Sequence, residues 1–104
     1  MSGLMNHVDK VRSKNAGPFW VTIDIFCKGL EGFQCVSSGL GNADVCKALH
    51  ANPDDLKRFD IEDLAVIKLS IPRPQVQGTV EDRDMHGAAI AVLIEELLSA
   101  TSIS

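Results

Sequence analysis

The sequence predicts an α+β protein, a two-layer sandwich in which helices cover one face of a small sheet. Three observations predict it: an alternating apolar run at residues 19–27, a second at 64–71, and helical spacing of apolar residues between positions 85 and 99. No repeat and no stretch typical of a linker divides the chain. We therefore expect residues 1–104 to form one domain.

The strongest strand signal is Phe19–Cys27, where one side is wholly apolar and the other is mixed. Such a mixed side is expected where it meets another layer or a second chain. The apolar side carries Phe19, Val21, Ile23, Ile25 and Cys27, and the mixed side carries Trp20, Thr22, Asp24 and Phe26. Residues 1–11 show no clear period, so we expect a frayed end that gains order only near Val8 and Val11.

Helix signals fill the space between the two strands. One helix is expected at Glu31–Ser38, and Asn42 is a suitable N-cap for a second one that runs to Leu49 or Ala51. The Asn52-Pro53 pair predicts a brief third helix that ends near Phe59.

The second strand is expected at Leu64–Ile71, and the prolines at 72 and 74 end it. Because two strands make a thin sheet, we expect weaker strands at 59–61 and 76–80, and a ferredoxin-like arrangement is one way to combine them. A final helix at 85–99, capped by Asp82 or Asp84, should cover the sheet.

Composition narrows the class of protein. The net charge of −4 and the pI near 5.2 disfavour nucleic-acid binding. The longest strongly apolar stretch, residues 88–94, is too short to cross a membrane, and no secretory signal opens the chain. Three cysteines cannot all pair with one another, and their spacings match no disulfide framework, which favours a reducing cytoplasm.

The candidate binding segment is Arg12-Ser13-Lys14-Asn15-Ala16-Gly17, directly before the first strand. Arginine and lysine hold carboxylates or phosphates, and the Asn-Ala-Gly turn sequence can direct backbone N–H groups at an anion. We therefore predict an anion-binding loop here. Alternation along this segment does not require both cations to share a side, so a solvated turn is the alternative interpretation.

Two further segments carry candidate residues. Arg73 stands between two prolines, and their rigidity lowers the entropy that Arg73 would lose on binding a ligand or a partner. The alternative interpretation is an arginine on a stiff loop with no binding role. Asp82 and Asp84 are helix caps, or they bind a metal or act as acid and base beside His86. Cys46 and His50 have zinc-ligand spacing, but no second pair completes a site, so we predict no metal and no cofactor.

Three motifs, Arg12-Ser-Lys-Asn-Ala-Gly-Pro18, Ile71-Pro-Arg-Pro74 and Asp82-Arg83-Asp84 with Gly87-Ala88, occur in this order. Together they resemble a small family of unknown function whose members are encoded beside, or fused to, proteins like the acyclic terpene utilisation protein AtuA. The resemblance implies that this chain is an accessory subunit that works with an AtuA-like large subunit in the catabolism of organic acids or acyl-CoA compounds. Family members often carry Gln-Gln-His-Ala-Pro after the Gly-Ala pair, whereas Ala89-Ile-Ala-Val-Leu93 follows here.

We therefore expect a small subunit that contributes a cationic loop to an anionic-substrate site shared with a larger partner, in a hetero- or homo-oligomer. The expected binding residues are Arg12, Ser13, Lys14, Asn15, Gly17, Arg73, Asp82, Arg83 and Asp84. Two alternatives remain. One is a stand-alone lyase or hydratase that uses Asp84, His86 or Lys14 for proton transfer, and the other is a structural module that stabilises an oligomer.

Overall fold

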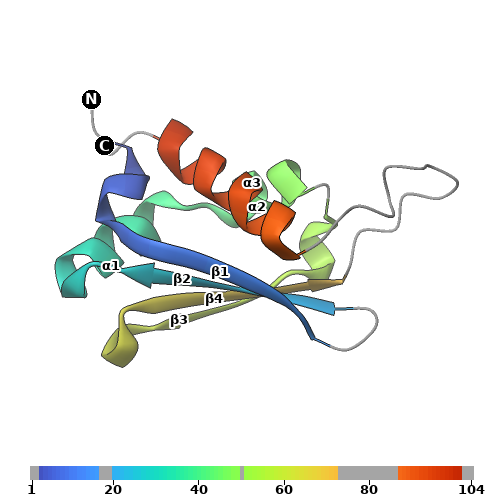
Figure 1. The fold of residues 1–104 in the computed structure, drawn as a ribbon, viewed down its shortest axis with the longest axis horizontal. Helices are drawn as coiled ribbons and strands as arrows, with labels where there is room; N and C mark the ends of the chain where they lie inside the picture. The colour runs from blue at the N-terminus through green and yellow to red at the C-terminus, as the bar shows by residue number, and fades with distance from the viewer. Residues whose placement is uncertain (1–2, 17–19, 50, 73–86, 102–104) are drawn as a thin grey trace, which may run out of the picture.

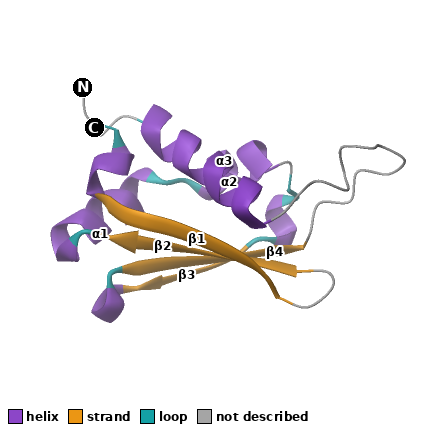
Figure 2. Ribbon diagram, viewed as in Figure 1, coloured by secondary structure: helices purple, strands orange, loops and turns teal. Residues whose placement is uncertain are grey.

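The protein is a two-layer α+β sandwich, described here by a computed structural model for residues 3–16, 20–49, 51–72 and 87–101. Helices lie on one side of a four-stranded antiparallel sheet, and no helix packs on its other side among these residues (Figures 1 and 2). The predicted fold class is therefore confirmed. None of the helices in the described ranges has the length and apolar character needed to span a membrane.

The sheet contains two hairpins placed side by side. Its spatial order is β1-β2-β4-β3, with each strand antiparallel to its neighbour, and the bounds are β1 Val8–Ala16, β2 Trp20–Cys27, β3 Lys57–Ile61 and β4 Val66–Pro72. A ferredoxin-like fold instead places a helix between its first two strands. That connectivity is not observed, because β2 follows β1 as its hairpin partner.

The helical layer covers the sheet with α1 (Gly29–Gly39), α2 (Asn42–Leu49) and α3 (Gly87–Ala100). Ile90, Ile94 and Leu98 of α3 recur at helical spacing and are almost fully buried, as the predicted covering role requires. Short 3₁₀ turns stand at Leu4–His7, Pro53–Asp55 and Glu62–Leu64.

The core lies between the layers and is dominated by β2 and β4. In β2 the predicted alternation is confirmed, since Val21, Ile23, Ile25 and Cys27 are buried while the residues between them are partly exposed. Burial, and to a smaller extent the charge of Asp60, raises the pKa of the Cys27 thiol to about 11, so this cysteine is an unreactive core residue.

The largest difference from the sequence prediction concerns the N-terminal segment. Residues 8–16 form β1, a full edge strand, where a frayed end and a binding loop were expected. The expectation failed because an irregularity in the pairing between Val8 and Lys10 breaks the period-two pattern. Arg12 to Asn15 are therefore strand residues, and the predicted loop is wrong for them.

Smaller differences follow from turn chemistry. The brief helix expected after Asn52 is a single 3₁₀ turn, capped by the Asn52 side chain, and β3 begins soon afterwards. The weak strand expected at 59–61 is confirmed as part of β3. The strand expected at 76–80 lies outside the described residues.

One glycine is required where α1 meets the N-terminal turn. A Cβ on Gly32 would lie 2.8 Å from the His7 carbonyl oxygen. That oxygen accepts a hydrogen bond from the Lys28 N–H at 2.8 Å, so it cannot move away without loss of this bond.

We predict that Gly32→Ala lowers the free energy of unfolding by about 1–2 kcal/mol, because overpacking outweighs the higher helix propensity of alanine. Thermal unfolding followed by circular dichroism measures the effect. Ser38→Ala, at an exposed position of the same helix, is the matched control and should change stability little. A more stable Gly32→Ala protein would contradict the prediction.

Candidate functional site

The candidate site lies on the face of the sheet that the helices leave uncovered, named here the open face. Strand alternation and the pairing register assign its residues, because directly paired residues share a face. They are Lys10, Arg12, Lys14, Ala16, Trp20, Thr22, Asp24, Phe26, Lys57, Phe59, Ile61, Val66, Lys68, Ser70 and Pro72. In this set five cations accompany one carboxylate, so the open face is locally positive although the whole chain is acidic.

A small depression on this face is lined by Arg12, Ser13, Lys14, Asp24 and Phe26. Its volume is about 160 Å³, which is below the size of typical ligand pockets, roughly 300–1,000 Å³. Arg12 and Lys14 are two residues apart on β1, so strand geometry places both cations on the same side. Neither forms an ion pair with any residue of the described ranges, and both side chains are exposed.

Asp24 forms part of the floor of the depression. It pairs with Arg12 on β1 and with Lys68 on β4, so a cation lies on each side of the carboxylate. Its Oδ1 atom is nevertheless buried without a hydrogen-bond partner among the described residues. An unsatisfied buried acceptor costs about 1–3 kcal/mol, and such an atom in a native structure calls for an explanation.

Aromatic rings give the open face apolar surface between its charges. The Lys10 ammonium lies 5.2 Å from the centre of the Phe26 ring, and Lys57 lies equally far from the Trp20 ring. Such cation–π contacts contribute about 0.5–1 kcal/mol each at exposed sites and restrict where the lysines point. Phe59 is 53% exposed, so part of this aromatic surface is accessible to a ligand or a partner.

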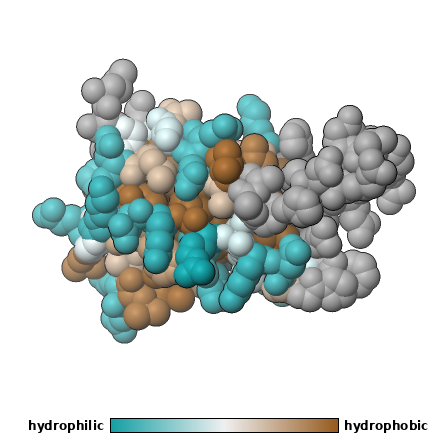
Figure 3. All heavy atoms as spheres, viewed as in Figure 1, coloured by the Kyte–Doolittle hydropathy of each residue, from teal (hydrophilic) through white to brown (hydrophobic). Residues whose placement is uncertain are grey.

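A larger hollow of about 550 Å³ lies against α3, on the helical side of the molecule. It is lined by Met5, Val92, Glu95, Glu96, Ser99 and Ala100. Among the described residues, two carboxylates and no cation line it, so this lining does not suit an anion. In the space-filling view, apolar surface appears over α3 and over the turn between β3 and β4 (Figure 3).

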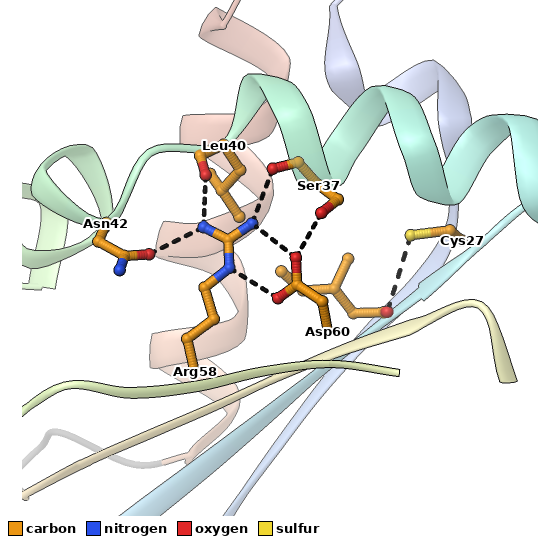
Figure 4. Close-up of polar contacts among 7 residues, drawn as sticks. Cys27, Ser37, Leu40, Asn42, Arg58 and Asp60 are labelled. Carbon is orange, nitrogen blue, oxygen red and sulfur yellow. Dashed lines mark hydrogen bonds and ion pairs between the residues drawn. The ribbon is translucent and has the colours of Figure 1, made fainter. Parts of the chain in front are cut away.

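Among the described residues, the densest polar cluster surrounds Arg58 on edge strand β3 and is structural (Figure 4). All five N–H groups of its guanidinium are used. Asp60 accepts from Nε and Nη2, the carbonyl oxygens of Ser37 and Leu40 accept from Nη2 and Nη1, and Asn42 Oδ1 also accepts from Nη1. Arg58 thereby joins β3 to the end of α1 and the start of α2, and has no donor left for a ligand.

Asp60 completes this cluster. It accepts hydrogen bonds from Arg58 and from the Ser37 hydroxyl. Burial alone would raise the pKa of this carboxyl, but these hydrogen bonds and the Arg58 charge outweigh it and hold the pKa below its usual value. The pair is therefore ionised at neutral pH.

The structure brings together Arg12, Ser13 and Lys14 from the predicted site, while Asn15 is an exposed residue of β1 outside the depression. Gly17, Arg73, Asp82, Arg83 and Asp84 lie outside the described residues, as does His50 of the Cys46 pair. In the described ranges, no group of three His, Cys, Asp or Glu side chains is placed to hold a metal ion.

Two members of the depression, Asp24 and Phe26, were not predicted as site residues. The signal that would have identified them is the mixed side of the β2 alternation, which contains both. It could be used only once β1 was recognised as the neighbouring strand, because pairing with β1 places Arg12 opposite Asp24.

A family model described as a domain of unknown function, DUF4387, matches residues 4–97. The chain belongs to this family. Searches of curated proteins and of solved structures gave no match. The residues of the open face and of the Arg58 cluster all lie within the matched range.

We predict that Arg58→Met lowers the free energy of unfolding by about 2–4 kcal/mol, because it removes hydrogen bonds to helix-end carbonyls and leaves Asp60 without its counter-charge. Chemical denaturation at pH 7 measures the change. Lys47→Met, at an exposed position of α2, is the control and should shift stability by less than about 0.5 kcal/mol. Equal losses of stability in the two variants would show that the hydrogen bonds of Arg58 do not stabilise the contact between β3 and the helices.

Proposed function

We propose that this DUF4387 protein is a cytoplasmic accessory subunit that binds a carboxylate or acyl-CoA substrate on its open face, beside an AtuA-like large subunit. The observation that carries the proposal is the placement of Arg12 and Lys14. They extend from alternate positions of β1 to line one depression, and neither is neutralised by an ion pair with a described residue.

The chemistry of these two side chains suits a small anion. Arginine offers a planar pair of donors that matches a carboxylate or phosphate, and lysine adds a mobile point charge. Arg58 provides the contrast, because its donors are all occupied within the protein. Arg12 and Lys14 are thus the exposed cations of the depression that remain available to a ligand.

The size of the depression favours a shared site. A volume of about 160 Å³ holds the charged end of a substrate, and the remainder would be enclosed by a second protein. Phe59 and Leu64, which are 53% and 68% exposed near the β3–β4 turn, supply apolar surface for such a partner. The motif resemblance to chains encoded beside AtuA-like proteins supports the choice of partner.

Shared catalysis also fits the residue types better than a stand-alone lyase or hydratase does. Proton transfer requires an acid and a base placed together. Among the residues that the structure describes, the lining of the depression contains one carboxylate and no histidine or cysteine, while Asp84 and His86 lie outside the described ranges. We therefore assign substrate binding to this chain and the chemical step to the large subunit.

We predict that Arg12→Ala and Lys14→Ala each weaken the binding of hexanoate by about tenfold, since a hydrogen bond to a charged group contributes about 1.5 kcal/mol. NMR titration of the purified chain measures this, with signals of β1 and β2 as reporters. Lys47→Ala, which removes an exposed cation on the helical side, should leave the affinity unchanged. Equal losses in all three variants would indicate general charge attraction and refute a site at Arg12 and Lys14.

We predict that the chain co-purifies with a co-expressed AtuA-like protein, and that Phe59→Asp or Leu64→Asp abolishes the complex. Val92→Asp changes an exposed apolar residue on α3, in the opposite layer, and should leave the complex intact. Size-exclusion chromatography with light scattering gives the stoichiometry. Absence of a complex with the unmodified chain would overturn the proposed partner.

A further inference from the structure

We infer that the depression selects a hydroxycarboxylate: Arg12 and Lys14 hold the carboxylate, and Asp24 Oδ1 accepts a hydrogen bond from the hydroxyl of the same molecule. This inference rests on the proposed anion binding at Arg12 and Lys14 and adds the substrate class. It also explains why a buried acceptor is left without a partner beside two exposed cations.

Asp24 lies between two cations in the sheet but forms no ion pair with either of them. It occupies a central strand, directly opposite Arg12 on β1 and Lys68 on β4, where an ion pair would be expected. No such pair forms among the described residues, and Oδ1 stays unsatisfied although its surroundings exclude water from it. Because Oδ1 has no contact with solvent, a ligand reaches it only when the exposed side chains beside it move; the ligand hydroxyl then donates to this oxygen while Arg12 and Lys14 hold the carboxylate.

The cations around Asp24 decide whether the ligand group that donates to it is charged or neutral. An ammonium group could also donate to Asp24, but Arg12 and Lys68 flank this carboxylate and Lys14 lines the same depression. A third positive charge between these cations is repelled, whereas a neutral hydroxyl is not. The arrangement therefore favours a hydroxy acid over the amino acid of the same length.

The apolar wall and the small volume of the depression limit the size of the ligand. Phe26 gives the depression one apolar side, where a short alkyl chain can lie. A volume of about 160 Å³ restricts the bound part to a few carbon atoms beside the carboxylate. The expected ligand is thus the 2- or 3-hydroxycarboxylate end of a small, partly apolar acid.

The test compares hexanoate, 2- and 3-hydroxyhexanoate and 3-aminohexanoate in NMR titrations of the full chain, with each enantiomer measured separately. At least one hydroxy acid should bind about tenfold more tightly than hexanoate, because a hydrogen bond to a carboxylate distinguishes them. The amino acid should bind no more tightly than hexanoate. In Asp24→Leu the preference for the hydroxyl should vanish while hexanoate binds at least as well as before.

Two further variants keep the test decisive. Thr22→Val removes a hydroxyl from the neighbouring open-face position on β2 and should leave the preference unchanged. If Asp24→Leu fails to fold, Asp24→Asn replaces it; removal of the charge should reduce the hydroxyl preference several-fold.

The outcomes separate this inference from the proposed function. Equal binding of hexanoate and both hydroxy acids, dependent on Arg12, would overturn the role of Asp24 and leave anion binding intact. A preference that survives in Asp24→Leu, or tighter binding of the amino acid, would also overturn it. Failure of every acid to bind would overturn both proposals.

Discussion

The structure depends on one strand that serves two environments at once. β2 pairs with β1 on one side and with β4 on the other, so it holds both hairpins in register. Its alternate side chains anchor the core beneath the helices, and those between them form the centre of the open face. A shift of one residue would exchange the two sets, burying Asp24 and exposing Ile23 and Ile25. Burial of the apolar side therefore fixes the geometry of the polar side.

Arg58 and Arg12 show how the surroundings of a side chain decide its role. Arg58 lies on the helix-facing side of an edge strand, where helix-end carbonyls and Asp60 satisfy every donor (Figure 4). Arg12 lies on the other face of the opposite edge strand and keeps its guanidinium in solvent. The first organises the fold of the domain, and the second is available for recognition.

The fold class, β2, β4 and the three α-helices could be predicted from the sequence because each has a strong period or a clear cap. β1 could not, because the irregular pairing at Val8 and Lys10 interrupts its alternation and residues 12–15 are all polar. The candidate site was accordingly predicted only in part. Arg12 and Lys14 were identified from their charge, whereas Asp24 and Phe26 join them only through cross-strand pairing. The Arg58 cluster depends on contacts between residues up to 23 positions apart, which no local pattern reveals.

The edge position of β1 gives its cations a second consequence. Among the described strands, β1 has a neighbour on one side only, so its outer backbone groups are open to a strand from another molecule. Lys10, Arg12 and Lys14 stand along this margin, and two copies approaching edge to edge would bring like charges together. The residues proposed to attract an acid thus also disfavour edge-to-edge pairing of this strand with a second copy. Neutralising these side chains would remove the like-charge repulsion that guards this edge.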